Sequence, residues 1–237
     1  MSINIVLLGP DDIVVASDGL VVDKHGTVVR TRARKSCRLN NRLCFVSGGA
    51  SVHAKVMLSQ MDGRCTALNS LCPEDDWEER KWTLPLDRAS AHSEMAKGYV
   101  ALAAEVARID AMPLDSAFFL CGWEDRAAVV SYYAMKPNRD GEMVPDIRQV
   151  SSLGKMRHFI NGIPAAHRAF AETDMRLEAL RDLQDAERVL VDCIRSAATC
   201  NSDLKANAHV LTRRLSDKFR PIWHDPTSSS EAPTPST

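Results

Sequence analysis

A serine, an aspartate and a lysine near the amino terminus have the residue types of an acyl-transfer site. Ser2 directly follows Met1, and methionine aminopeptidases remove Met when the next residue is small, so we expect Ser2 to become the mature N-terminus. Its hydroxyl would then lie beside a free α-amine, whose reference pKa of about 8 allows it to accept a proton near neutral pH. A hydroxyl with its own amine as base is a complete nucleophile–base pair.

Asp18 and Lys35 are the candidates for controlling the charge of that pair. A nearby ammonium lowers the pKa of an amine and favours the alkoxide, and an acid holds the ammonium in place. Asp18 ends an apolar run, and Lys35 ends the basic segment 30–35 at the head of the next strand. Both residues are therefore expected to lie near Ser2.

The surrounding pattern predicts the elements that position these residues. Residues 1–8 and 13–19 are rich in β-branched side chains and flank a Gly-Pro-Asp-Asp turn, so they predict a β-hairpin. A further apolar run, Leu43–Val46, leads into Gly48 and Gly49. The sequence thus predicts three core strands before residue 50.

Residues 2–58 resemble the amino-terminal half of a proteasome β-type subunit of the bacterial, HslV-like kind, which is an N-terminal nucleophile (Ntn) hydrolase. The family pattern is an N-terminal Thr, two strands that end in Asp, a basic segment that ends in Lys, and a strand that enters a Gly-containing turn before a long helix. At the family spacing, the Thr falls on Ser2 and the Asp on Asp18. The Lys falls on Lys35 and the oxyanion-hole Gly on Gly49, with one extra residue before Lys35.

Each of these residues also has a purely structural interpretation. Asp18 could simply close a strand into a turn, and Lys35 lies in a basic run of the kind that covers solvated surfaces. Gly48 and Gly49 could form a plain strand-to-helix turn, because Gly tolerates positive φ. The joint spacing of the residues favours the catalytic interpretation.

The second half of the chain departs from the family. Proteasome β subunits have a Gly-Ser-Gly turn whose Ser supports the N-terminal amine, and the resemblance places this role on Ser152, with Ser151 as the alternative. A later Asp-x-x-Ser-Gly-Gly motif braces the same site. The nearest stretch here keeps Ser202 but lacks the leading Asp and the Gly pair, and Asp203 could substitute. HslV-like subunits also lack this second motif.

The resemblance implies a mechanism in which Ser2 attacks a peptide carbonyl while its own amine accepts the hydroxyl proton. The backbone N–H of Gly49 would stabilise the oxyanion, with Gly48 beside it, and water would then hydrolyse the acyl-enzyme. Lys35 and Asp18 would set the electrostatics without carrying the proton. Ser lacks the methyl group that stiffens χ1 of Thr, so we expect slower acyl transfer than in the family.

The rest of the chain predicts groups of helices and strands. Expected helices span 51–62, 87–112, 155–170 (interrupted near Gly162 and Pro164) and 175–199, and expected strands span 117–122, 127–135 and 147–153, with a surface loop or short helix at 73–86 and a closing hairpin at 209–212 and 219–223. The second helix has one apolar stripe, formed by Met95, Tyr99, Leu102, Val106 and Ile109.

Strands and helices grouped in this way favour an α+β fold. The resemblance implies a four-layer αββα sandwich of the proteasome-like Ntn-hydrolase kind. We expect a single domain over 1–223, followed by a disordered Ser/Thr/Pro-rich tail over 224–237.

Composition narrows the partners and the compartment. The 237-residue chain is 45% hydrophobic and has a net charge of −1 with mixed signs, so no nucleic acid and no membrane partner is expected. No signal peptide is predicted. The seven cysteines lack paired CxxC spacing, which favours reduced thiols in the cytoplasm and argues against a zinc site. No cofactor and no metal is expected.

Three functions remain compatible with the residues and the resemblance. The first is a peptidase that cleaves peptides or unfolded proteins inside a homo-oligomeric ring, with an ATPase or unfoldase partner implied by the resemblance alone. The second is a catalytically silent structural subunit of a proteasome-like assembly. The third is an Ntn amidase that acts on a small molecule.

Overall fold

The structure of the chain is a computed structural model. It describes residues 3–22, 25, 27–61, 87–110, 112–125, 127–152, 156–161, 175–180, 183, 185–199 and 209–226. The expected loop at 73–86 and almost all of the expected tail lie outside these residues.

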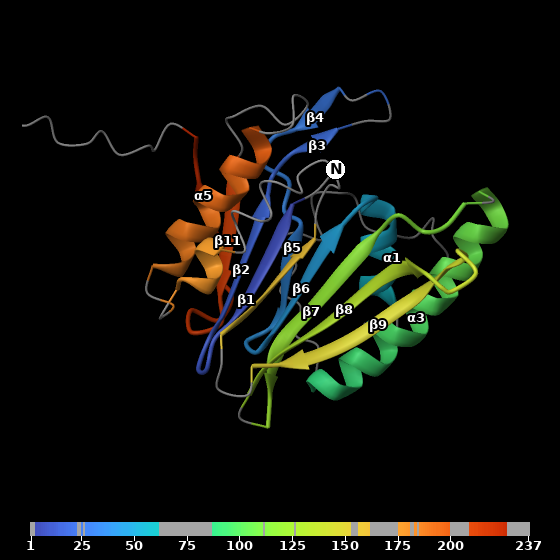
Figure 1. The fold of residues 1–237 in the computed structure, drawn as a ribbon, viewed down its shortest axis with the longest axis horizontal. Coiled ribbons are helices and arrows are strands. Elements are labelled where there is room, and N and C mark those ends of the chain that lie inside the picture. The colour runs from blue at the N-terminus through green and yellow to red at the C-terminus, as the bar shows by residue number, and fades with distance from the viewer. Residues whose placement is uncertain are drawn as a thin grey trace, which may run out of the picture.

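In the part of the chain that the structure describes, two five-stranded antiparallel sheets and the helices α1, α3 and α5 form an α+β fold (Figure 1). The first sheet has the strand order β10-β1-β2-β11-β12, with β1 Asn4–Leu8, β2 Ile13–Asp18, β10 Arg157–Asn161, β11 Val210–Arg214 and β12 Ile222–His224. The second sheet has the order β5-β6-β7-β8-β9, with β5 Ser36–Asn40, β6 Leu43–Gly48, β7 Ala117–Glu124, β8 Ala127–Pro137 and β9 Met143–Ser151. The short strands β3 Val21–Val22 and β4 Val28–Arg30 pair only with each other.

The predicted hairpin at the start of the chain is confirmed. β1 and β2 pair antiparallel from Asn4 opposite Ser17 to Leu8 opposite Ile13, and Gly9 N–H donates to the carbonyl of Asp12 at 2.8 Å to close the turn. The closing hairpin is also confirmed, because β11 and β12 pair antiparallel and β11 lies against β2. The first sheet therefore joins the two ends of the described chain.

Alternation along β1 sends its side chains to opposite faces of the first sheet. Ile5 and Leu7 pack in one cluster with Leu190 and Ile194 of helix α5, Ala186–Thr199. Val6 and Leu8 belong to a second cluster that includes Phe119 and other side chains of the second sheet. The first sheet is thus apolar on both faces, with α5 against one of them (Figure 1).

The other face of the second sheet packs against two helices, α1 Ser51–Met61 and α3 Arg88–Asp110. Phe45 and Phe118 from the sheet meet Met57 of α1 and Tyr99 of α3 in a third cluster. The ring of Tyr99 lies edge-on to Phe118 with centroids 5.9 Å apart, which is a favourable aromatic geometry.

Residues 157–161 form strand β10, so the helix predicted for 155–170 is wrong there. β10 pairs antiparallel with β1, from Arg157 opposite Leu8 to Asn161 opposite Asn4. Phe159 packs between the sheets while Ile160 packs with the α5 cluster. Adjacent apolar residues on opposite faces hide the period of two that normally identifies a strand.

The single long helix predicted for 175–199 is also wrong. The chain is helical at 175–178, leaves the helix at 179–180, and becomes helical again at Ala186. Leu183, between these pieces, lies against the β1–β2 turn, where its side chain contacts the site of Gly9. Its carbonyl accepts a hydrogen bond from Arg214 at 3.0 Å, so tertiary contacts replace helical bonds at this point.

Two smaller corrections concern α3 and β9. Met95, Tyr99 and Leu102 of the predicted stripe are buried, but Ile109 is 60% exposed because it lies in the last turn of α3. β9 begins at Met143, earlier than the predicted strand.

Among the described residues, no helix combines the length and apolar character that a membrane span requires.

Ile13→Ala should lower the free energy of unfolding by about 2–5 kcal/mol, because it removes a fully buried side chain between the two sheets. Ile109→Ala is the matched control and should change it by no more than about 0.5 kcal/mol, because that side chain is exposed. Urea unfolding followed by circular dichroism measures both. Equal losses in the two variants would contradict this assignment of the core.

Candidate active site

Asp18 and Lys35 form a buried ion pair at one end of the two sheets. Lys35 Nζ lies 2.6 Å from Asp18 Oδ2, with Asp18 fully buried and Lys35 7% exposed. Asp18 is the last residue of β2, and Lys35 directly precedes β5. Burial lowers the pKa of Lys35, and the charge of Asp18 opposes that shift. The ammonium is thus held in a poorly solvated position by one carboxylate.

The same carboxylate binds the first residues of the chain. Ile3 N–H donates to Asp18 Oδ1 at 2.5 Å, and Leu20 N–H donates to Oδ2 at 3.0 Å. Ser2, which directly precedes Ile3 in the sequence, lies outside the described residues. The carboxylate of the ion pair is therefore hydrogen-bonded to the residue that follows the predicted nucleophile.

The second sheet contributes the end of β6 to this region. Lys35 O accepts hydrogen bonds from the backbone N–H of Ser47 at 2.7 Å and from its hydroxyl at 3.2 Å. Asn4 Nδ2 donates to Ser47 O at 3.1 Å. These bonds tie β1, the residue before β5 and the end of β6 together, although they are far apart in sequence.

Two buried polar side chains of the first sheet lie in the same region. Asn4 and Ser17 are opposite each other on β1 and β2. Asn4 Oδ1 and Ser17 Oγ are both buried and have no hydrogen-bond partner among the residues that the structure describes. A buried polar atom without a partner is costly, so this point of the sheet favours a bound water or another polar group.

The turn after β6 requires glycine at Gly49. Its φ is +103°, in the region that L side chains rarely adopt, and a Cβ at this position would lie 2.7 Å from the Cα of Ser116. Gly48 ends β6 and pairs with Ala117 of β7. The turn then leads directly into α1, so its backbone lies at the end of the sheet that also holds Lys35.

Ser151 and Ser152 are not brought to this end of the sheets. Ser151 pairs with Val129 on β8, and Val129 pairs with Gly122 on β7. Ser152 follows at the end of β9, buried, and its N–H donates to Ala128 O at 2.8 Å. Ser151 and Ser152 therefore lie level with the beginning of β6, whereas Lys35 and Gly49 lie near its end.

Gly122 pairs with Leu43, five residues before Gly48 on β6, which corresponds to about 17 Å along a strand. The register therefore places Ser152 far from the level of Gly48 and does not support the prediction that Ser152 assists the N-terminal amine. The chain crosses to the first sheet after β9, and β10 then carries the backbone of Asn161 back to the level of Asn4. Ser202 and Asp203 lie outside the described residues.

Sequence reasoning missed Ser116 and His53, which lie behind the Gly49 turn. His53 Nδ1 and Ser116 Oγ are 2.8 Å apart although the residues are 63 positions apart in sequence. It also missed Asn4 and Ser17. A signal for these two was present, because a polar residue within an otherwise apolar, buried run is unusual.

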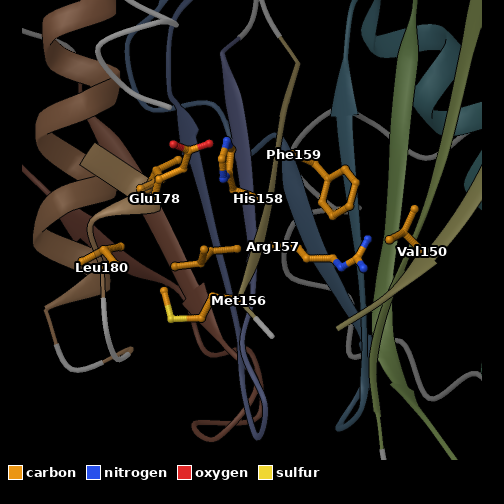
Figure 2. A pocket seen from close by; sticks show the side chains of 9 residues that line it. Val150, Met156, Arg157, His158, Phe159, Glu178 and Leu180 are labelled. Atoms are coloured by element: carbon orange, nitrogen blue, oxygen red, sulfur yellow. The ribbon is translucent and has the colours of Figure 1, made fainter. Parts of the chain in front are cut away.

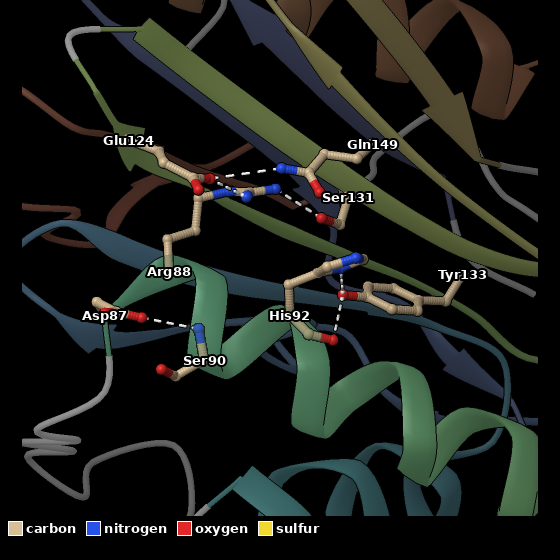
Figure 3. Close-up of polar contacts among 8 residues, drawn as sticks. All are labelled: Asp87, Arg88, Ser90, His92, Glu124, Ser131, Tyr133 and Gln149. Carbon is tan, nitrogen blue, oxygen red and sulfur yellow. Dashed lines mark hydrogen bonds and ion pairs between the residues drawn. The ribbon is translucent and has the colours of Figure 1, made fainter.

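A second polar cluster lies at the amino-terminal end of α3 (Figure 3). Arg88 is 3% exposed, forms an ion pair with Glu124, and donates to Ser131 Oγ at 2.6 Å. His92 Nδ1 lies 2.7 Å from the hydroxyl of Tyr133, and burial lowers the pKa of His92. These contacts join α3 to β7 and β8, so the cluster has a structural role.

An open cavity of about 440 Å³ lies along the outer edge of β10 (Figure 2). Arg157 and Phe159 point toward Val150 of β9, whereas His158 lies on the other side of the strand, near Glu178. Arg157 pairs with Leu8, so the cavity begins at the end of β1 opposite to the Asp18–Lys35 pair.

Neither metal nor thiol chemistry is indicated by the described residues. They contain no group of three or more His, Cys, Asp or Glu side chains that could hold a metal ion. Cys37, Cys44, Cys121 and Cys193 are free and buried, and burial raises the pKa of Cys44 to about 12. The prediction that the thiols are buried is confirmed for these four.

The chain matches no protein-family model and no curated protein sequence.

Asp18→Asn should lower the free energy of unfolding by about 3–5 kcal/mol, because it removes the carboxylate opposite the buried Lys35 charge. The loss should shrink toward about pH 10, where the unfolded chain releases its lysine proton. This sign follows because Asp18 opposes the lowering of the Lys35 pKa by burial, so removing the carboxylate lowers that folded pKa further. The unfolded state of the variant then binds more protons than its folded state, and the stability of the variant rises with pH more than that of the parent.

Urea unfolding at two pH values measures these effects. Asp18→Asn combined with Lys35→Met should recover part of the loss, because it removes both charges. Glu94→Gln, at the exposed Lys97–Glu94 pair, is the control and should have little effect. A loss in Asp18→Asn no larger than in Glu94→Gln would show that the buried pair does not constrain the fold.

Gly49→Ala should destabilise the protein more than Gly141→Ala. Both glycines have positive φ, so each variant loses about 1–2 kcal/mol from backbone strain. A Cβ at Gly141 meets nothing within 4 Å, whereas at Gly49 it overlaps Ser116. Thermal unfolding of the two variants tests the difference, and equal midpoints would contradict the close packing of this turn.

Proposed function

We propose that the protein is a proteasome-like Ntn hydrolase that cleaves peptide bonds with Ser2, after removal of Met1, as its nucleophile. The observation that carries the proposal is the buried Asp18–Lys35 pair, whose carboxylate also binds Ile3 N–H. A charged pair is costly to bury. The carboxylate of this pair also binds the residue after a potential N-terminal nucleophile, so a catalytic role would explain why the charges are buried.

The proposal includes the four-layer αββα arrangement of the Ntn-hydrolase fold. It is supported by three apolar clusters, which lie between α5 and the first sheet, between the two sheets, and between the second sheet and helices α1 and α3. The candidate site lies where β2 ends and β5 begins, at one end of the two sheets.

The chemistry of the site follows from the charges around Ser2. Lys35 would lower the pKa of the Ser2 α-amine, so that the amine is neutral and accepts the hydroxyl proton. The Oγ–carbon bond forms as the proton moves to the amine, and the Gly49 N–H stabilises the oxyanion. The amine then returns the proton to the leaving nitrogen, the peptide C–N bond breaks, and water releases the acyl group.

The proposed substrates are peptides or unfolded proteins, and the proposed assembly is a homo-oligomeric ring in the cytoplasm. Ring closure by heterologous contacts would enclose the active sites. An ATPase or unfoldase partner belongs to the proposal by family resemblance only.

Ser2→Ala should reduce cleavage of fluorogenic peptides by at least about 1,000-fold, because it removes the nucleophile. Mass spectrometry should find Ser2 at the mature N-terminus of the parent protein, modified by an epoxyketone or β-lactone probe. Ser2→Thr should retain both activities. Ser90→Ala, an exposed serine in the first turn of α3, is the matched control and should cleave like the parent.

Each alternative function has its own outcome in this experiment. Retained Met1, with no labelling and no peptide cleavage, would identify a catalytically silent structural subunit. Hydrolysis of small amides without peptide cleavage, by a protein that elutes as a monomer or dimer in size-exclusion chromatography, would identify an Ntn amidase. Either result would refute the peptidase proposal.

A further inference from the structure

A buried side chain at the end of the connection between β6 and β7 holds the Gly49 turn in place. Ser116 directly precedes β7 and is 1% exposed. Its Oγ accepts a hydrogen bond from Ala50 N–H at 3.1 Å, and its backbone lies against Gly49 at a distance that excludes a Cβ there. Ser116 therefore contacts two successive residues of the turn.

His53, in the first turn of α1, holds the hydroxyl of Ser116 in the orientation that this contact needs. A hydroxyl has one donor and two acceptor positions. If Ser116 Oγ accepts from Ala50, its proton can point to His53 Nδ1, 2.8 Å away. This arrangement requires neutral His53, and burial lowers the pKa of His53, while Asp115 and Asp110 oppose the shift.

The backbone of Ser116 is fixed as well. Tyr99 OH, from α3, donates to Ser116 O at 3.1 Å, and this bond is buried. The aspartate next to it offers a weaker alternative for the hydroxyl, because Asp115 Oδ1 lies 3.4 Å from Ser116 Oγ. Both α1 and α3 therefore hold Ser116 in one position behind the turn.

A turn with two adjacent glycines needs such an external restraint. Glycine has the largest range of backbone conformations, but an oxyanion donor must lie about 2.7–3.1 Å from the position where the charge develops. A bond to Ala50 N–H fixes the peptide plane after Gly49, and contact with Gly49 limits the φ of that residue. Together they restrict the direction of the Gly49 N–H.

We propose that Ser116 is a positioning residue that, together with His53, sets the orientation of the Gly49 N–H for oxyanion stabilisation. This inference rests on the proposed function. Ser116 and His53 have the separation of a nucleophile–base pair, but Ser116 is almost completely buried and its oxygen is occupied by Ala50. Its role is therefore to act through Gly49 and not on the substrate.

Ser116→Ala should lower kcat for a fluorogenic peptide by about 10–100-fold while KM changes less than about two-fold, because a misplaced donor weakens binding of the transition state and not of the substrate. Hydrogen exchange of the Ala50 amide, measured by NMR, should accelerate at least about ten-fold when its acceptor is removed. The two readouts together separate positioning from a general loss of stability.

Ser131→Ala is the matched control, because Ser131 is also buried and accepts one side-chain hydrogen bond, from Arg88, away from the turn. It should leave both kcat and the exchange of Ala50 unchanged. A second pair of variants keeps Ser116 in place. His53→Leu removes the acceptor for the hydroxyl and should lower kcat, whereas His53→Asn offers an oxygen in its place and should retain more activity.

Four results would overturn this role. In an active parent, an unchanged kcat in Ser116→Ala would refute it, and so would unchanged exchange at Ala50. Should Ser116→Ala fail to fold, equal kcat values in the parent, His53→Leu and His53→Asn would refute it instead. A parent that neither cleaves peptides nor labels at Ser2 would refute the proposed function itself, and the role of Ser116 with it.

Discussion

The buried carboxylate of Asp18 is the interaction on which the arrangement of this end of the molecule depends. It accepts hydrogen bonds from Lys35 Nζ and from the backbone N–H groups of Ile3 and Leu20. A carboxylate without solvent needs such donors, so the start of β1, the end of β2 and the residue before β5 must meet. Burial lowers the pKa of the Lys35 ammonium, which is held by the same carboxylate that binds Ile3 N–H.

A comparison with the Arg88 cluster shows why burial of charge alone does not define a site. Arg88 is as buried as Lys35 and also pairs with a carboxylate, but Glu124 is 28% exposed on its side chain and the pair connects a helix to a sheet. Structural ion pairs also perturb pKa values. The Asp18–Lys35 pair differs because its carboxylate also binds Ile3 N–H and the carbonyl of Lys35 binds Ser47, two residues before the Gly49 turn with its positive φ.

Local pattern was sufficient for much of the fold, because many strands are short apolar runs bounded by turn residues and α3 has a buried apolar stripe. The opening hairpin, β6, α1, most of α3, β7, β8 and the closing hairpin follow from periodicity and turn residues. β10 did not, since its only apolar side chains, Phe159 and Ile160, are adjacent and flanked by polar residues, which gives neither an apolar run nor an alternation. The break near Leu183 did not either, because contacts with the β1–β2 turn and Arg214 outweigh helix propensity there.

The candidate site divides in the same way. Local sequence patterns were enough to predict that Asp18 and Lys35 lie at the ends of core segments and that Gly49 occupies a strand-to-helix turn, because these are properties of short stretches of chain. The three-dimensional structure was needed to show that Ser152 lies at the opposite end of the second sheet and that Ser116 and His53 meet behind the glycine turn. Sheet register and the packing of α1 and α3 set those distances, and both depend on contacts between residues far apart in the sequence.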